Sequence, residues 1–207
     1  MTEHLRRQTI DTYDKSAEAL AEKFRGIGPR VQHIEQALHL AGDPAEARVL
    51  EIGCGDGRDA KEIIQRVDWY KGIDPSKGMI KLAMAHVQSP GAHFEVADPL
   101  LSEFPSNLDI IYAFASILHM SKEENALIME KASKTLRPGG IYYISTKERA
   151  QYESELQADE FGTRLFYYYT PEVICELAGS NFELAALSRS QVGHTAWIEM
   201  ALQKPFK

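Results

Sequence analysis

From Arg48 onward, short apolar strands alternate with amphipathic helices, and this alternation limits the possible folds more than any other feature. The strands expected in this region are VLEIG (49–53), WYKGID (69–74), HFEVAD (93–98), LDIIYAF (108–114) and IYYIS (141–145). The run LDIIYAF is nearly continuous in apolar residues, as in a strand buried on both faces. Such alternation predicts a mostly parallel sheet with helices on both faces, which binds ligands beyond the carboxyl ends of its strands.

The segments between and after these strands predict the helices and one sheet edge. Helices are expected from Arg58 to about Val67, over 75–87, from the SKEE capping box at 121–124 through Leu136, and over 170–179. The last two apolar runs, 181–189 and 194–204, follow each other directly with a short turn between them. They predict an antiparallel hairpin at one edge of the sheet.

The first 25 residues predict a helix with one apolar face. The residues that recur at steps of three and four are Ile10, Tyr13, Ala17, Leu20 and Phe24. A second helical stretch is expected from Pro29 to about Leu40, followed by a linker at 42–44. An apolar face of this kind must cover another part of the protein.

Composition excludes several classes of protein. The 207 residues carry a formal net charge of -7, which gives no electrostatic footprint for nucleic acid. Neither a signal peptide nor an apolar run of membrane-spanning length is visible, so we expect a cytoplasmic protein without a membrane partner. Cys54 and Cys175 form no CxxC pair, and the seven histidines have no ligand spacing, so we expect no metal.

The stretch VLEIGCGDGRD (49–59) places three glycines at alternate positions after the first strand. A glycine turn before a helix lets the backbone approach a ligand, and the helix N-terminus favours an anion, whether a carboxylate or a pyrophosphate. Position 58 is Arg, whereas a dinucleotide fingerprint has its third glycine there. Asp74 and Asp98 end the next two strands, so their carboxylates are expected on the same rim as the loop.

With these elements in order, the sequence resembles the class I S-adenosylmethionine-dependent methyltransferases of the small-molecule type over nearly its whole length. VLEIGCGDGRD looks like their first motif, and the later motifs match GIDPSKGMI, VADPL, IIYAFASILHM and LRPGGIYYIS. The resemblance implies an α/β, Rossmann-like, doubly wound sheet of seven strands that ends in an antiparallel hairpin. The cofactor that it implies is S-adenosyl-L-methionine.

The resemblance also implies the cofactor-binding residues. Asp74 would accept the ribose hydroxyls, and Asp98 would accept the adenine amino group. The remaining candidates are Glu51, Gly53, Cys54, Gly55, Pro75, Met79, Ala97, Pro99, Ala113 and Phe114. For Met79, packing in the core explains the position equally well.

Residues 12–24 are similar to the helix that covers the cofactor pocket in small-molecule members of this family. Tyr13 is the candidate lid residue, although its place in the apolar stripe also suits a core aromatic. We therefore expect one domain over 1–207, with a helical lid at 1–45 and a Rossmann-like core at 46–207.

His119 is the catalytic candidate, because it follows the fourth strand near the reactive end of the cofactor. It would orient or deprotonate an acceptor; alternatively, it is a loop histidine that hydrogen-bonds the backbone. A base is needed only where the acceptor must lose a proton.

Residues 161–171 resemble the variable substrate segment of the family. The candidates for contact with the acceptor are Arg164, Tyr167, Tyr169 and His194. Strand alternation predicts that Phe166 and Tyr168 face one way and Tyr167 and Tyr169 the other, so that at most half of this cluster lines one site. Trp197 is expected to pack. The acidic stretch 151–160 is expected to be a solvated helix or loop, and it leaves a cationic acceptor open.

The sequence thus predicts a methyltransferase that acts on an O, N or S atom of a small molecule by in-line displacement, as a monomer or homodimer. Two alternatives remain open: a nicotinamide-dependent oxidoreductase and a non-catalytic protein that binds S-adenosylmethionine.

Overall fold

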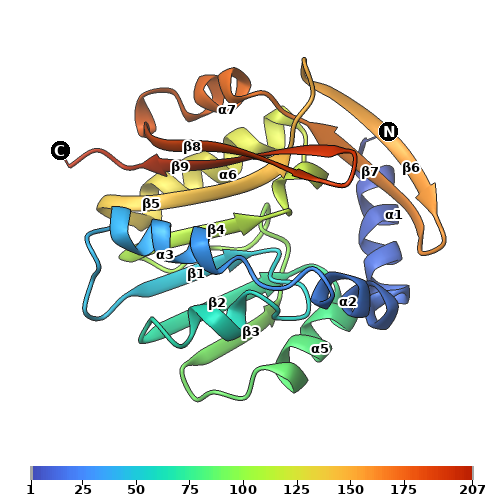
Figure 1. Ribbon diagram of the computed structural model, residues 1–207, viewed down its shortest axis with the longest axis horizontal. Helices are drawn as coiled ribbons and strands as arrows, with labels where there is room; N and C mark the ends of the chain where they lie inside the picture. The colour runs from blue at the N-terminus through green and yellow to red at the C-terminus, as the bar shows by residue number, and fades with distance from the viewer. Residues whose placement is uncertain (1, 207) are drawn as a thin grey trace.

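The computed structural model describes residues 2–206, and its centre is a seven-stranded sheet in the order β3-β2-β1-β4-β5-β9-β8 (Figure 1). The strands are β1 (Arg48–Ile52), β2 (Trp69–Asp74), β3 (Ala92–Val96), β4 (Leu108–Phe114), β5 (Leu136–Lys147), β8 (Glu183–Val192) and β9 (Thr195–Gln203). Strands β1 to β5 pair in parallel, whereas β9 is antiparallel to both β5 and β8. The predicted fold class, including the hairpin at the edge, is confirmed.

Strand β4 lies at the middle of this sheet, and all seven of its residues are buried. This is the outcome predicted from its apolar run. Strand β1 has β2 on one side and β4 on the other, so the chain order reverses between β1 and β4. In open α/β sheets, ligands bind at this switch point, beyond the carboxyl ends of the strands.

Helices cover both faces of the sheet. Apolar residues of α3 (Val31–Leu40) and α4 (Ala60–Ile63) join one core cluster with β1 and β4. Apolar residues of α6 (Lys122–Thr135) and α7 (Pro171–Ala178) join the cluster on the opposite face. The predicted capping box begins α6: Glu124 N donates to Ser121 Oγ at 3.3 Å, and Ser121 N donates to Glu124 Oε2 at 2.7 Å.

Helix α4 is shorter than predicted, because the chain must turn back to pair with β1. Arg66 N donates to Ile63 O at 2.9 Å, which closes a tight turn at the end of the helix. Trp69 then pairs with Arg48 as β2 begins. Strand β5 begins at Leu136, earlier than the predicted strand at 141–145, with an irregular register opposite β4 and Gly139 at φ 78°.

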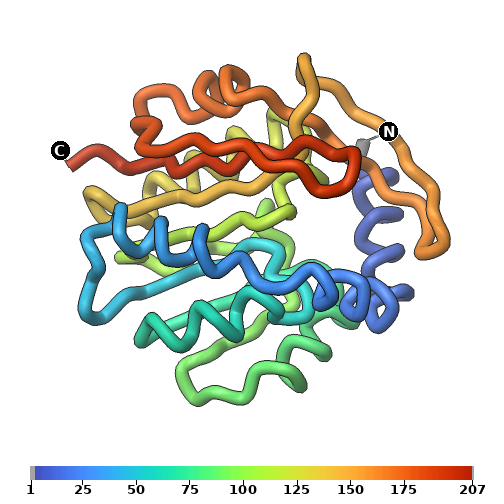
Figure 2. The backbone as a smooth tube through the Cα atoms, in the orientation of Figure 1, coloured from blue at the N-terminus to red at the C-terminus, as the bar shows by residue number. Residues whose placement is uncertain are grey.

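The N-terminal segment forms two helices, α1 (Thr2–Lys15) and α2 (Ala17–Arg25), where the sequence predicts one. They lie against a hairpin of β6 (Glu153–Asp159) and β7 (Gly162–Tyr168), which corrects the predicted helix or loop at 151–160. Figure 2 shows α1 and α2 in blue beside this hairpin in orange, at one end of the sheet. Helix α5 (Lys77–His86) lies next to the same two helices.

Hydroxyl groups hold α1 to the hairpin. Thr12 Oγ1 donates to Thr163 O at 2.8 Å, Ser16 Oγ donates to Phe161 O at 2.7 Å, and Leu165 N donates to Thr9 Oγ1 at 2.9 Å. Each bond satisfies a polar group where two segments distant in sequence meet. Over residues 2–206, no helix is both long and apolar enough to cross a membrane.

Candidate active site

A cavity of about 480 Å³ opens beyond β1, β2 and β4 and is covered by α1, α2 and the β6–β7 hairpin. The residues predicted to bind the cofactor that line it are Tyr13, Glu51, Gly53, Cys54, Gly55, Asp74, Pro75, Met79, Pro99 and Phe114. His119 and Arg164 line it as well. The structure therefore brings together side chains from the loop, three strand ends and the N-terminal helices.

The glycine loop has a backbone that side chains would disturb. Gly53 and Gly55 have φ angles of 72° and 56°, in the left-handed region that favours glycine. A Cβ atom on Gly53 would overlap with Cβ of Ser116, whereas one on Gly55 would meet no protein atom within 4 Å. The first glycine thus allows the loop to pack on the segment after β4, and the second leaves the cavity open.

The carboxylate of Asp74 is oriented by the backbone. Its Oδ2 accepts from Gly55 N at 3.1 Å, and its Oδ1 accepts from Ser76 N at 2.8 Å. Burial raises the pKa of Asp74 to about 6. Glu51 is buried beside it and accepts from the hydroxyl of Tyr70 at 2.5 Å, and burial raises the pKa of Glu51 well above its usual value.

Two arginines that the sequence analysis did not select line the cavity near the loop. Arg30 Nη1 and Arg58 Nη2 both donate to Asp59 Oδ2 at 2.6 Å. Nε of Arg58 is buried and has no hydrogen-bond partner within residues 2–206. The position of Arg58 inside the first motif could have identified it as a cavity residue, because a cation there can bind an anionic group of a ligand. No motif surrounds Arg30, so the sequence around it gives no such indication.

Tyr13 and His119 form a hydrogen-bonded pair in the cavity. His119 Nδ1 lies 2.7 Å from the carbonyl oxygen of Leu165, so Nδ1 carries the proton and donates it. Nε2 is then the acceptor for the Tyr13 hydroxyl at 2.9 Å. Burial lowers the pKa of His119 to about 3 and raises the pKa of Tyr13. The imidazole is therefore neutral, with its tautomer fixed.

The end of the cavity beneath the β6–β7 hairpin carries a different set of groups. Arg164, Phe166, Gln157 and Asp159 line it from the hairpin. The other walls come from Lys147 at the end of β5 and from Trp197 on β9. Trp197, which was expected to pack, does pack against the cluster of Leu118, Phe166 and Tyr168, and it also lines the cavity.

Three residues predicted to contact the acceptor do not line the cavity. Alternation along β7 turns Tyr167 and Tyr169 into the main core, and the hydroxyl of Tyr169 donates to Met120 O at 2.6 Å. Phe166 and Tyr168 face the other way, as the alternation predicted. His194 lies at the exposed turn between β8 and β9.

Three residues predicted to contact the cofactor also lie outside the cavity lining. Ala97 and Ala113 are buried in the core cluster. Asp98 forms an ion pair with Arg6 of α1 and accepts from Leu100 N at 3.0 Å. Its carboxylate therefore holds the N-terminal helix rather than facing the cavity.

Known proteins share both the sequence pattern and the fold. Residues 49–140 match the family model described as "Methyltransferase domain". An uncharacterised methyltransferase of Geobacillus sp. (strain WCH70) is 26% identical over 187 residues, which cover 83% of this chain and 84% of the relative. A ubiquinone biosynthesis O-methyltransferase of Pseudomonas fluorescens (strain Pf0-1) is 27% identical over 124 residues, which cover 58% of this chain and 51% of the relative.

Among solved structures, a DhpI–SAH complex superimposes with a TM-score of 0.71 at 17% identity, covering 98% of each chain. At 17% identity, this similarity shows that the two chains share a fold. Together, the family match, the order of the motifs and the seven-stranded topology support an α/β methyltransferase. The family model and the relatives that this chain resembles support a class I S-adenosylmethionine-dependent methyltransferase.

Proposed function

We propose that this protein binds S-adenosylmethionine in the cavity at the β1–β4 switch point and transfers the methyl group to a small organic acceptor by in-line displacement. The observation that carries the proposal is the convergence of the glycine loop, the Asp74 carboxylate and the Tyr13–His119 pair on one cavity. The nicotinamide alternative is disfavoured by Arg58 in place of the third fingerprint glycine and by the terminal hairpin.

The groups in the cavity fit the parts of the cofactor. Asp74 has free lone pairs for ribose hydroxyls, and the Glu51 side chain offers oxygen atoms near the loop. The unpartnered Nε of Arg58 supplies a buried donor suited to a carboxylate. When bound, the cofactor supplies a methyl group that is electrophilic because it is carried on a sulfonium.

The main task of the protein is then to align the acceptor and exclude water. We propose that residues 1–45 act as a lid on the core formed by 46–207, within one domain. Two hydroxyls of α1 and that of Ser16, between α1 and α2, donate to or accept from the hairpin, and Asp14 Oδ1 accepts from Gly78 N at 2.7 Å, at the start of α5. The lid is thus held to both sides of the cavity that it covers.

The Tyr13–His119 pair can position a hydroxyl acceptor and receive its proton. Because the Tyr13 proton is committed to His119 Nε2, Tyr13 Oη can accept a hydrogen bond from the acceptor and direct its lone pair. As the new bond forms, the acceptor oxygen becomes very acidic, so its proton passes to Tyr13 Oη while the Tyr13 proton moves to Nε2. A neutral imidazole with a pKa of about 3 is basic enough for this late transfer.

The Asp74→Ala variant tests the cofactor site. It is expected to weaken S-adenosylmethionine binding by about 1–3 kcal/mol, because the ribose hydroxyls lose a charged partner. Calorimetry measures this, with Asp11→Ala, exposed on α1, as the control. Unchanged affinity would contradict the placement, and stronger binding of a nicotinamide dinucleotide to the unmodified protein would replace the proposed function.

Cofactor affinity is also expected to depend on pH through Asp74. Since the pKa of this carboxyl is raised to about 6 by burial, the carboxylate form is present above pH 6 and is lost as the pH falls through 6. The dissociation constant should therefore be constant above about pH 7 and rise by up to about tenfold per unit below about pH 6. Calorimetric titrations from pH 5 to 8 measure this dissociation constant. The Asp74→Asn variant should lose its rise below about pH 6.

A further inference from the structure

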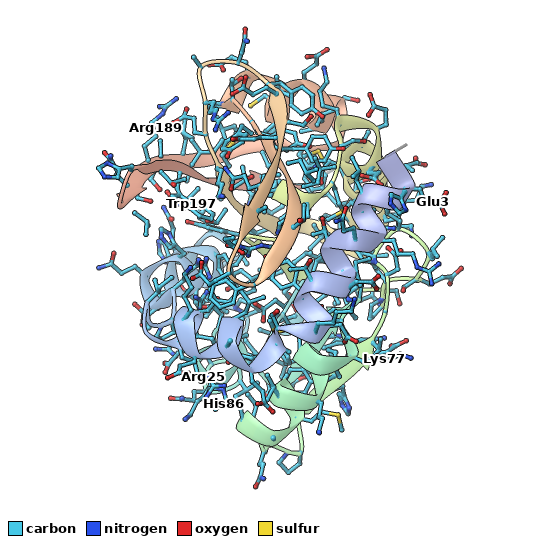
Figure 3. The ribbon with its side chains drawn as sticks, turned by 90° about the vertical axis from the view of Figure 1, so that its right-hand side faces the viewer. Glu3, Arg25, Lys77, His86, Arg189 and Trp197 are labelled. Carbon is cyan, nitrogen blue, oxygen red and sulfur yellow. The ribbon has the colours of Figure 1, made fainter. Side chains whose placement is uncertain are left out.

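At the end of the cavity under the hairpin, the aromatic ring of Phe166 lies next to two functional groups. The ring of Phe166 lies 4.8 Å from the His119 ring, centroid to centroid, and Nζ of Lys147 lies 3.6 Å from the Phe166 ring centroid. Lys147 Nζ and the His119 imidazole therefore both lie next to the Phe166 ring. Figure 3 looks onto the cover of this region, with Trp197 beside the hairpin.

Hydrogen-bond donors without partners gather at this end of the cavity. Nε of Arg164 and Nε1 of Trp197 are buried and have no partner within residues 2–206, and Arg164 as a whole is only 8% exposed. Lys147 forms no ion pair with any described residue. Buried donors without acceptors are costly, so their concentration in a cavity points to a ligand that supplies acceptor oxygens.

The charges at this end leave one positive charge in excess. Arg164 forms an ion pair with Asp159, which neutralises it, while Lys147 has no carboxylate partner. Burial lowers the pKa of Lys147 to about 8, so its ammonium group still predominates at neutral pH. One excess charge matches a ligand with a single negative charge.

The acids of the hairpin do not serve a cationic acceptor. Glu153 and Glu155 both pair with Arg149, outside the cavity lining, and Glu160 is exposed near Lys23. Only Asp159 of this stretch lines the cavity, and it is bound to Arg164. The acidic side chains of 151–160 therefore form ion pairs within the hairpin and with its neighbours, and none is free for a cationic acceptor.

We propose that the methyl acceptor is a small organic carboxylate, with its anionic oxygens on Lys147 Nζ, Arg164 Nε and Trp197 Nε1 and its nucleophilic atom at the Tyr13–His119 pair. Phe166 supplies the surface on which the body of the acceptor lies. This inference rests on the proposed function, because it assigns the acceptor to the part of the cavity next to the cofactor.

Paired probes test the inference. 3-Hydroxybenzoate, 4-hydroxybenzoate, salicylate and lactate, each beside its uncharged amide, are titrated by calorimetry into the protein saturated with S-adenosylhomocysteine. At least one acid is expected to bind about tenfold or more tightly than its amide, as for one charge-assisted hydrogen bond. Lys147→Met should abolish this preference, and Lys81→Met, an exposed residue of α5, should retain it.

Methyl transfer is then followed by mass spectrometry with the same probes. Preference for the amides, equal binding of acids and amides, binding of no acid, or a preference that survives Lys147→Met would overturn the inference. Cofactor affinity measured on the same samples separates the two claims. Normal cofactor binding without acid preference overturns the carboxylate assignment alone, whereas no cofactor binding overturns the proposed function and the inference that rests on it.

Discussion

Replacement of Gly53 by alanine is expected to destabilise the fold and abolish cofactor binding. The left-handed φ of 72° disfavours any side chain, and the added Cβ would overlap with Cβ of Ser116 after β4. The loop cannot retreat freely, because Gly53 N and Cys54 N both donate to Ile73 O. Strain and overlap together should cost about 3 kcal/mol or more, a decrease in Tm of roughly 6–12 °C.

Gly55→Ala provides the matched comparison two residues away. Its φ of 56° also lies in the left-handed region, but the new Cβ would meet no protein atom. Only the backbone cost of about 1–2 kcal/mol is then expected, while the methyl group enters the cavity proposed to hold the cofactor. Thermal unfolding and calorimetry compare the two variants. Equal stability of Gly53→Ala and Gly55→Ala would show that the contact with Ser116 does not constrain the loop.

The sheet was predictable because its signals are local. In β4, seven buried residues coincide with an apolar run, and the last two strands, β8 and β9, are joined by a short turn that requires them to be antiparallel neighbours. The Ser121–Glu124 capping box likewise depends on residues three positions apart. Where burial and hydrogen bonding depend on residues within one element, the sequence pattern of that element predicts them.

The β6–β7 hairpin was not predicted because its hydrophobic pattern is inverted. Leu156 is exposed, whereas Gln157 and Glu155 face partners on β7, where the hydroxyl of Tyr168 contacts both. The inner positions of β6 are thus polar, since they meet polar groups of β7 and, at Asp159, the cavity. A strand that serves a binding site does not show the alternation typical of a strand that covers a core.

The sequence predicted which residues line much of the cavity, but not which side chains they contact. Gly53, Gly55 and Asp74 follow from their places at strand ends, and all three line the cavity. The ion pair of Arg6 with Asp98 joins positions 92 residues apart, and no spacing rule indicates such a contact. It reassigns Asp98 from the cavity to the attachment of α1, a role that appears only once the chain is folded.

Loss of the Tyr13–His119 pair is expected to slow methyl transfer strongly. His119→Ala is expected to lower the rate of methyl transfer about 10²-fold or more with a hydroxyl acceptor, because the pair no longer fixes and receives the acceptor proton. Cofactor affinity should be nearly unchanged. Tyr13→Phe, which removes only the hydroxyl, should cause a similar loss. Single-turnover transfer of a labelled methyl group, with calorimetry of the cofactor, measures both variants.

The double variant decides whether the two residues act together. Because the Tyr13 proton must move to His119 Nε2, removing either group breaks the same relay, and the double variant should be little slower than either single variant. If the rate losses of the two single variants instead multiply in the double variant, the two residues have separate roles. Full activity of His119→Ala would leave the imidazole with its bond to Leu165 O as a purely structural contact. A thiolate acceptor has no proton to lose, so it should be insensitive to the pair in the same protein.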